Sequence, residues 1–192
     1  MAAYTTIDDP SAYFKVQLYT GTGSSHAITF DDTDTELSPD FVWNKSRVDA
    51  GYSHNWFDTV RGATKALEGD ATAAEYTNAN AVTAFGSNGF TVGSDNGNNK
   101  SSSTFVAWCW KESADAGFDI VSYTGTGSAR TISHSLSAVP EFMIFKCRNV
   151  THGSLVYHSG NTSAPETDSL SITYDSATAD NNTHWNDTAP TS

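Results

Sequence analysis

The sequence predicts an all-β protein built from tandem antiparallel β-sandwich modules, the second of them incomplete. Three observations support this prediction: a polar composition poor in charge, short strand-like segments bounded by turns, and an internal repeat. Only 17% of the residues are charged, against roughly 25% in an average soluble domain. Ser, Thr and Asn are abundant instead, and their side chains compete for the helical backbone. The one helix-like stretch, residues 63–76, is interrupted by Gly69 and has no apolar stripe.

The internal repeat organises the whole chain. The hexapeptide Tyr19–Ser24 recurs identically as Tyr123–Ser128, and residues 39–47 line up with residues 140–148. Such self-similarity is the mark of a repeat architecture. The second copy, counted from Phe118, stops roughly 20 to 25 residues before the point that the first copy reaches. We therefore expect the chain to be the front part of a longer protein.

This repeat divides the chain into four segments. They are an N-terminal arm (1–13), a first β-sandwich module (14–112), a linker (113–117) and a second, truncated β module (118–192). A module of about 100 residues is long enough to bury a core of its own.

The strands of the first module follow from its apolar pattern. Residues 14–19 alternate apolar with polar side chains and end at Gly21-Thr-Gly23. This sequence predicts a hairpin turn, because glycine adopts positive φ without strain. Residues 41–45 form a short apolar run after a proline. Residues 105–110 carry apolar side chains at both parities, so we expect this strand to be buried on both faces.

The second module repeats this pattern. The segments 118–123, 142–146, 155–157 and 170–174 have the alternation or the apolar runs that are typical of strands. Many short strands separated by turns indicate a sandwich or a barrel. The sequence therefore predicts antiparallel sheets throughout.

The charge balance limits the partners. Acidic residues outnumber basic ones 22 to 10, which gives a net charge of −12, and such a surface repels the phosphate backbone of nucleic acids. Residues 1–10 lack the basic and apolar regions of a signal peptide, and no apolar run is long enough to span a membrane. We expect assembly in a host cytoplasm, no nucleic-acid partner and no membrane insertion. The two cysteines, Cys109 and Cys147, are expected to be reduced core thiols.

No motif for catalysis or cofactor binding is found. Gly21-Thr-Gly23 lacks the third glycine of a dinucleotide loop, because His26 stands in its place. Neither a GxSxG motif nor a P-loop occurs, and Cys109 lies in an apolar segment where a thiol has no reason to ionise. Paired carboxylates for sugar hydrolysis depend on distances in three dimensions, which a sequence does not give. We expect a protein without enzymatic activity, catalytic residues or cofactor.

Metal binding is considered at two kinds of position. The loops 31–36 and 95–99 supply the oxygen ligands that calcium takes, but neither has the spacing of an EF-hand. Turns are also rich in Asp and Asn for purely local reasons. His152 and His158 share one face of a predicted strand, but no third ligand accompanies them. We predict no metal site, and calcium at the two loops stays an alternative.

Aromatic residues supply the candidates for contact with a glycan or a partner protein, because their faces stack on sugar rings and fill interfaces. Three tryptophans lie in predicted strands and are expected in the core: Trp43, Trp108 and Trp110. Three other aromatic residues have polar neighbours in the sequence and are the candidates for exposed contact: Tyr52, Trp56 and Trp185.

Several segments together resemble the repeated modules of bacteriophage virion proteins, especially tail-fibre and tail-associated proteins of marine phages. They are Thr6–Phe14, Tyr19–Ser24, Pro39–Arg47, Asp58–Gly62 and Phe105–Lys111, and the second copy with Trp185–Thr191 resembles the next module of the same array. The resemblance covers essentially the whole chain. It implies a concanavalin-like (jelly-roll) β-sandwich with a structural role and without an assigned catalytic centre.

The resemblance leads to one expected function and two alternatives. We expect the N-terminal anchoring part of a tail fibre or tail-associated protein, which contacts other virion proteins and takes part in host attachment. Because fibres are usually symmetric, a homotrimer or another symmetric homo-oligomer is expected. The first alternative is a lectin-like module that binds glycans of the host surface, with aromatic residues and calcium. The second is a capsid decoration protein.

Overall fold

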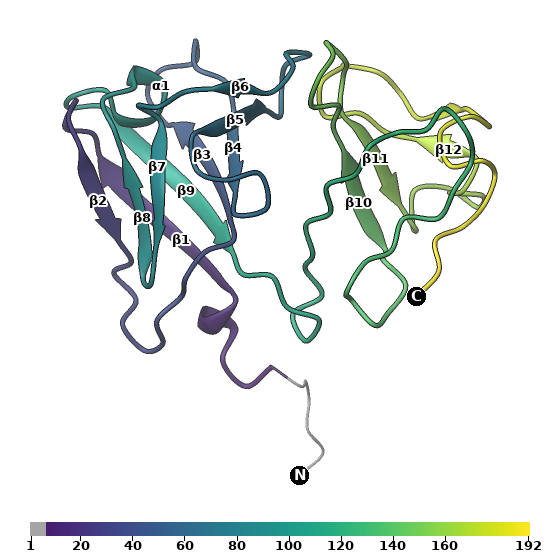
Figure 1. Cartoon of the computed structure of the whole chain (residues 1–192), viewed down its shortest axis with the longest axis horizontal. Coiled ribbons are helices and arrows are strands. Elements are labelled where there is room, and N and C mark those ends of the chain that lie inside the picture. The colour runs from purple at the N-terminus through teal and green to yellow at the C-terminus, as the bar shows by residue number, and fades with distance from the viewer. Residues whose placement is uncertain (1–6) are drawn as a thin grey trace.

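Short strands joined by turns and irregular segments make up residues 7–192, the part of the chain that this computed structural model describes. The helices are a short 3-10 turn, η1 (Pro10–Ala12), and one turn of α-helix, α1 (Asn96–Asn99). The sheets are antiparallel, so the all-β prediction is confirmed. Figure 1 shows two bodies along the chain, the first coloured from purple to teal and the second from green to yellow. Within residues 7–192, no helix is long and apolar enough to cross a membrane.

The first module consists of two antiparallel sheets. The larger sheet has the strand order β1 (Phe14–Thr20), β9 (Thr104–Trp110), β3 (Phe41–Ser46), β4 (Asn55–Asp58), β5 (Lys65–Glu68) and β6 (Tyr76–Thr77). The smaller sheet has the order β2 (His26–Thr29), β8 (Gly89–Val92) and β7 (Val82–Gly86). The two sheets form the two layers of a sandwich, and the chain passes between them several times.

The core of this sandwich comes from both sheets. Val42 on β3 and its cross-strand partner Phe57 on β4 are fully buried on the inner face of the larger sheet. Ile28 on β2 and Phe90 on β8 belong to the same cluster from the smaller sheet. The buried cluster consists of Ile28, Phe30, Leu37, Val42, Phe57, Ala66, Ala81, Val82, Phe90, Val92, Ala107 and Cys109.

Strand β9 lies in the interior of the larger sheet. It pairs with β1 along Phe14–Thr20 and with β3 along Phe41–Ser46. The inner-face residues Phe105, Ala107 and Cys109 are fully buried, whereas the residues of the outer face are half-buried. The prediction that both faces of this strand are buried is therefore correct for the inner face only. Because β1 is the edge strand of this sheet, its ladder depends on β9 alone.

The Gly21-Thr-Gly23 turn crosses between the sheets. It joins β1 of the larger sheet to β2 of the smaller one, so the predicted hairpin is wrong. The Gly21 amide donates to the Ser103 carbonyl at 2.8 Å, and a Cβ at Gly21 would collide with the carbonyl oxygen of Lys100. Gly23 has a φ of +72°, which glycine adopts without strain. The glycines therefore serve the close approach of this turn to the chain that enters β9.

The segment 63–76 contains strands and not a helix. It holds β5 and the start of β6, which pair with each other, and Ala66 and Leu67 are buried. Gly69 follows β5 and lies directly against the indole of Trp56, where a Cβ would come within 2.3 Å of the ring. The glycine that interrupts the helical pattern thus has a packing role.

The second copy keeps the pairing registers of the first. Its strands are β10 (Phe142–Phe145), β11 (Leu155–His158), β12 (Asp168–Ser169) and β13 (Ala179–Asp180). β10 pairs with β11 so that Phe142 faces His158, in the way that Phe41 of β3 faces Asp58 of β4. β12 pairs with β13 in the register of β5 with β6. An isolated bridge from β11 to Leu170 corresponds to the pairing of β4 with β5.

Turns of the first copy recur as well. The Asn181 amide donates to the Thr167 carbonyl at 2.7 Å, and the same bond joins Asn78 to Thr64 at 2.8 Å. The segment 113–117, expected to be a linker, forms the same kind of turn as η1 and its flanks. It is therefore better described as the beginning of the second copy.

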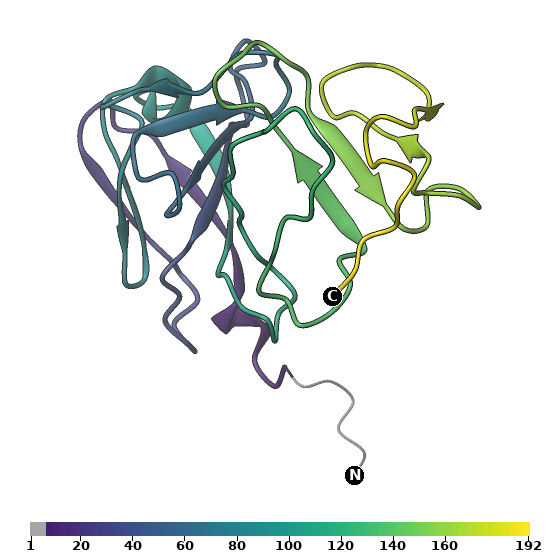
Figure 2. The same ribbon diagram turned by 45° about the vertical axis from the view of Figure 1, so that its right-hand side comes forward.

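Two segments of the second copy that were predicted as strands remain irregular, and these predictions are wrong. Residues 118–123 form no ladder, and of residues 170–174 only Leu170 makes a bridge. In Figures 1 and 2 the first of these segments runs between the first module and β10 as a trace without an arrow. The physical reason is that β1, its counterpart, pairs only with β9, and residues 118–192 contain no counterpart of β9. Backbone groups without a partner strand stay solvated in a coil.

The incomplete second copy also explains the one thiol that was wrongly predicted. Cys109 is buried in the core of the first module, as expected, but Cys147 is exposed. By the alignment of the copies, Cys147 stands where Ser46 is buried on β3. The strands that would cover this position in a complete copy are missing from residues 118–192.

Truncation of the sandwich core provides a test of this packing. Phe57→Ala should lower the free energy of unfolding by about 3–5 kcal/mol, because it removes a fully buried ring from a close-packed cluster. Urea denaturation followed by tryptophan fluorescence measures this change. Val48→Ala is the control, since Val48 is 66% exposed and its loss should change stability by no more than about 0.5 kcal/mol. Equal effects of the two variants would contradict the assigned core.

Candidate functional site at the junction of the two copies

The three aromatic candidates for exposed contact do not form one site. Trp56 is only 5% exposed and lies in the middle of the larger sheet, so its selection as an exposed residue is wrong. Tyr52 is half-buried, with the Lys100 ammonium 5.8 Å from its ring centroid. Trp185 is also half-buried, and its indole nitrogen donates to the Asp168 carbonyl at 2.7 Å.

Trp185 packs against the strands of the second copy. Continuing the alignment of the copies through β13 places it at the position of Val82, a buried residue of the first module. Its ring packs 5.1 Å from Phe145 and 5.8 Å from Tyr157, measured between centroids. The polar residues next to Trp185 in the sequence therefore did not indicate that its ring packs against other aromatic rings.

Several polar groups of the two acidic loops are hydrogen-bonded within the protein. Both carboxylate oxygens of Asp95 accept hydrogen bonds, from Asn78 at 2.9 Å and from Asn98 at 2.7 Å. Asp31 accepts from the Gln17 amide at 2.7 Å. Throughout residues 7–192, no group of three or more His, Cys, Asp or Glu side chains is placed to hold a metal ion.

The outer face of the larger sheet carries a row of aromatic rings. The strand register places Trp43 of β3 between Trp56 of β4 and Trp108 of β9, with ring centroids 5.4 and 5.9 Å apart. Phe41 and Trp110 continue the row at 5.6 Å. We call these five residues, with Phe14 on β1, the aromatic face. The expectation that these three strand tryptophans lie in the core is therefore wrong, because Trp43, Trp108 and Trp110 are half-buried on this outer face.

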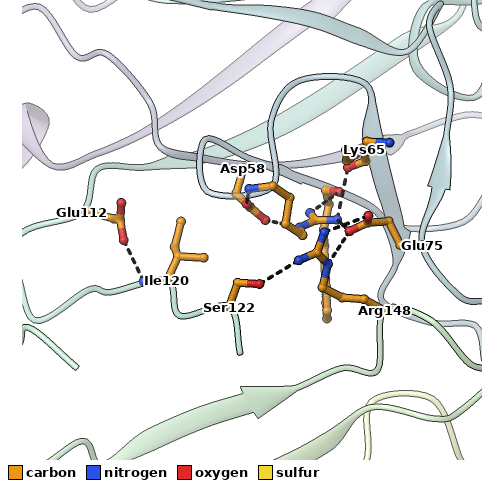
Figure 3. A network of polar contacts seen from close by, with 9 residues as sticks. Asp58, Lys65, Glu75, Glu112, Ile120, Ser122 and Arg148 are labelled. Carbon is orange, nitrogen blue, oxygen red and sulfur yellow. Dashed lines mark hydrogen bonds and ion pairs between the residues drawn. The ribbon is translucent and has the colours of Figure 1, made fainter. Parts of the chain in front are cut away.

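The second copy covers one part of the aromatic face. The Phe118 ring stacks on Trp110 at 6.0 Å with an interplanar angle of 21°, and it also contacts Phe41. The Ile120 amide donates to the Glu112 carboxylate at 2.9 Å (Figure 3). Burial raises the pKa of Glu112, and Asp119 beside it adds to the effect. The start of the second copy thus packs against the outer face of the first module.

Beside the aromatic face, a buried arginine holds the junction together. The side chain of Arg61 is 5% exposed and donates to Asp58 at 2.5 Å and to Glu75 at 3.3 Å. It also donates to the backbone carbonyls of Trp56 and Lys65. A buried guanidinium with this many acceptors is satisfied, whereas an unpaired one would be costly.

Glu75 links the two copies (Figure 3). It accepts two bonds from Arg148 of the second copy, at 2.8 and 3.0 Å, and Arg148 also donates to Ser122 at 2.7 Å. Burial acts to raise the pKa of Glu75, but the bonds and charges of Arg148 and Arg61 outweigh it, so the pKa of this carboxyl lies below its usual value. The bond to Glu75 raises the pKa of Arg148 in turn.

Backbone bonds reinforce the ion pairs. The Glu75 amide donates to the Arg148 carbonyl, and the His152 amide donates to the Thr72 carbonyl, each at 2.8 Å. The Lys146 ammonium donates to the Ala71 carbonyl at 2.5 Å. The junction therefore consists of a ring contact, a chain of ion pairs and backbone bonds, which together can hold two modules in a set orientation.

The part of the outer face that the second copy leaves uncovered is apolar. Phe14, Val16 and Leu18 of β1 are 39%, 47% and 53% exposed, respectively. They alternate with the buried residues Lys15 and Gln17, so all three point to the same side of an edge strand. This apolar edge strip, defined by the three residues, lies beside the half-buried residues of β9.

Sequence reasoning missed the residues that join the copies. Arg148 was part of the repeated segment 140–148, Arg61 lay in the segment Asp58–Gly62 that contributes to the resemblance, and Glu75 lay in the helix-like stretch 63–76, but none was singled out for a role. Their signal was indirect: only ten basic residues occur in the chain, so each arginine is a candidate for a specific partner. No sequence pattern places Glu75 beside Arg148.

One family model matches the chain, over residues 9–192, and its description is Domain of unknown function (DUF7483). The matched region includes both copies of the repeat. No curated protein and no solved structure matches the chain.

The ion pairs predict a junction that weakens in acid. Because the pKa of Glu75 is lowered in the folded protein, its contribution to the junction is fully present above the ordinary value of 4.5 and is lost as the pH falls through the lowered value. Hydrogen exchange of the Glu75 and His152 amides, expressed as protection factors between about pH 7 and pH 3, should show this loss.

Glu75→Gln should weaken the protection of both amides at neutral pH and remove its dependence on pH in this range. Glu141→Gln changes an exposed carboxylate outside the ion-pair chain and serves as the control. If protection at the junction falls equally in the control, or is unchanged in Glu75→Gln, the assigned role of Glu75 is wrong.

Proposed function

Since the chain belongs to the DUF7483 family, we propose from its own residues that it is a structural protein of a phage virion. Within the virion it is the N-terminal anchoring part of a tail fibre or tail-associated protein that takes part in host attachment. The protein holds modules and partner proteins in place, and it catalyses no reaction. It assembles with other virion proteins as a homotrimer or another symmetric homo-oligomer.

The observation that carries this proposal is the apolar edge strip on β1. Three adjacent outward-facing apolar side chains, each more than a third exposed, lie on an edge strand next to a row of aromatic rings. Exposed apolar surface of this kind marks protein contacts, and interface centres are enriched in aromatic residues. A partner that packs on the strip would extend the surface that the second copy already covers at Phe118.

The junction between the copies also supports a structural role. Ion pairs and backbone bonds fix the second copy on the first through Glu75 and Arg148, and an array of modules joined in this way would be a stiff rod. The net charge of −12 keeps many crowded copies soluble. The resemblance of the repeated segments to phage tail-fibre modules points the same way.

The arrangement of the aromatic residues disfavours the lectin-like alternative. A glycan site needs aromatic faces and polar groups that converge, but Trp56 is buried and Trp185 packs inside the second copy. Tyr52 is the remaining candidate, and it is half-buried next to Lys100. A glycan array in the presence and absence of a chelator separates the two functions: binding that is abolished by Tyr52→Ala would favour the lectin, and no binding is expected.

Assembly through the apolar edge strip is directly measurable. The double variant Val16→Asp, Leu18→Asp should dissociate the oligomer, because it places two charges on a contact surface. Light scattering coupled to size-exclusion chromatography gives the mass of each species. Val48→Asp, at an exposed position outside the strip, should leave the mass unchanged. A wild-type protein that stays monomeric at all concentrations would contradict the proposed oligomer.

Location in the particle tests the virion role itself. Gold-labelled antibodies against this chain should mark the tail of purified phage particles that carry it, in a few copies per particle. Labelling spread evenly over the capsid would instead identify a decoration protein. Particles in which mass spectrometry does not detect the chain would exclude a virion protein altogether.

A further inference from the structure

The free edge of β1 presents backbone groups as well as apolar side chains. β1 pairs with β9 alone. The Tyr13 carbonyl accepts from the Lys111 amide at 2.9 Å, and the Gly21 amide donates to the Ser103 carbonyl at 2.8 Å. Backbone groups of successive residues point to opposite edges of a strand, so the odd-numbered residues of β1 face β9. The even-numbered residues of the apolar edge strip therefore direct their amides and carbonyls to the free edge.

These backbone groups are available to a further strand. The amides of Phe14, Val16 and Leu18 make no hydrogen bond on this edge within residues 7–192. The Leu18 carbonyl accepts one bond, from the Gln17 side chain at 3.0 Å, and a carbonyl has a second lone pair. A groove of about 400 Å³ follows the strand, lined by residues 14–18 and 30–32. Residues of both faces of β1 line this groove, so it lies along the edge itself.

β1 lacks most of the features that protect edge strands from pairing. Such features are outward charges, prolines, bulges and short strands, whereas all seven residues of β1 keep an unbroken register with β9. The charged residue of the strand, Lys15, points inward and is 5% exposed. Its ammonium donates to the carbonyls of Asp32 and Thr35. The charge of Lys15 is therefore satisfied within the first module, and the edge stays accessible.

We propose that two molecules of this protein pair through β1, antiparallel about a two-fold axis at Val16, so that their larger sheets become one continuous sheet. A two-fold interface uses the same surface of both subunits, and strand addition gains affinity from backbone hydrogen bonds. The inference rests on the proposed function for the strip as an assembly surface. It narrows the symmetric homo-oligomer to subunits that pair about a two-fold axis, and it does not depend on the location in a virion.

The apolar edge strip is complementary to itself in this register. Phe14 lies opposite Leu18 of the partner subunit, and the two Val16 residues lie opposite each other, so every outward pair of the strip is apolar. Apolar cross-strand pairs stabilise a sheet, whereas like charges directly opposite destabilise it. On the inner face, Lys15 lies opposite Gln17 of the partner subunit. An axis at Lys15 would instead bring two ammonium groups together, and an axis at Gln17 would take Phe14 past the end of the strip.

The later segments of the chain join the first module elsewhere. The larger sheet has β1 at one edge and β6 at the other, and the second copy of the repeat bonds to Glu75, directly before β6. Phe118 covers Trp110 and Phe41, but Phe14 remains 39% exposed. The free edge belongs to the first module, which contains both of its sheets, and does not arise from the incomplete second copy. The self-complementary strip therefore favours a second molecule of this protein as the occupant.

Disulfide trapping tests the register. All variants carry Cys147→Ser, because Cys147 is exposed. Val16→Cys should form a disulfide-linked dimer on oxidation, since paired residues at this position have Cα atoms about 5.5 Å apart, within the range of a disulfide. Phe14→Cys and Leu18→Cys should each fail to link to themselves, because about 13 Å along the strand separates the two thiols. A mixture of these two variants should link, and Val48→Cys, at an exposed position outside the strip, should not.

A proline variant separates backbone pairing from apolar contact. Val16→Pro removes an amide that points to the free edge and keeps the ladder with β9. The dissociation constant of the dimer should rise at least about tenfold, because two hydrogen bonds between the subunits are lost. Val16→Ile keeps the amide and an apolar side chain, and it should associate like the wild type. Sedimentation equilibrium measures both constants, and circular dichroism melting curves that match the wild type show that the variants are folded.

Hydrogen exchange of the wild type gives a readout that needs no substitution. Protection of the amides of the apolar edge strip should rise with protein concentration, because these amides bond to the partner subunit. Protection of the Lys15 and Gln17 amides should not change, because they face β9 at any concentration.

The outcomes distinguish this pairing from the proposed function. An oligomer in which Val16→Cys does not link, or links no better than Val48→Cys, overturns the two-fold pairing and leaves the symmetric oligomer intact. Equal association of folded Val16→Pro and Val16→Ile overturns it too. A wild-type protein that stays monomeric at all concentrations contradicts both. Linkage of Val16→Cys, and of Phe14→Cys only with Leu18→Cys, supports the pairing even where phage particles lack the protein.

Discussion

The pairing of β9 with strands on both of its edges is the constraint on which the rest of the structure depends. An edge strand such as β1 satisfies its ladder only through one neighbour, and that neighbour is β9. The same hexapeptide begins within the last two residues of a strand in the first copy, Tyr19–Ser24, and lies in an irregular segment in the second, Tyr123–Ser128. The hexapeptide itself is identical in the two places, whereas the partner strand β9 pairs only with the first of them. β-structure is in this sense a property of pairs of segments.

The junction depends on a different kind of interaction. Ring packing at Phe118 covers part of the aromatic face, but apolar contact alone permits many orientations. The chain of contacts from Asp58 through Arg61 and Glu75 to Arg148 is directional, because each donor and acceptor has a set geometry. Its net contribution to stability is small in comparison with core packing, since charges lose hydration when they are buried. Its structural effect is to select one arrangement of the two copies.

The predictions from sequence succeeded where the signal was an apolar period and failed where burial depended on distant segments. The strands at 14–19, 41–45, 105–110 and 142–146 appear as expected. Trp56 was misjudged because its neighbours along the chain are polar, although its neighbours across the sheet are Trp43 and Leu67. Trp185 was misjudged for the same reason, since Phe145 and Tyr157 reach it from other strands. The junction between the two copies was not predicted at all, because no sequence pattern indicates which carboxylate an arginine pairs with.

The sequence by itself determined the all-β class, the repeat, the acidic surface and the positions of some strands, because composition and period act locally along the chain. Only the tertiary structure decided which segments became strands of a sheet, which tryptophans were covered, and how the second copy sits on the first. These outcomes depend on contacts between residues far apart in sequence, such as β1 with β9 and Glu75 with Arg148. A ladder needs two strands, and an ion pair needs two charges. The fold determines whether the second strand or the second charge lies close enough to the first.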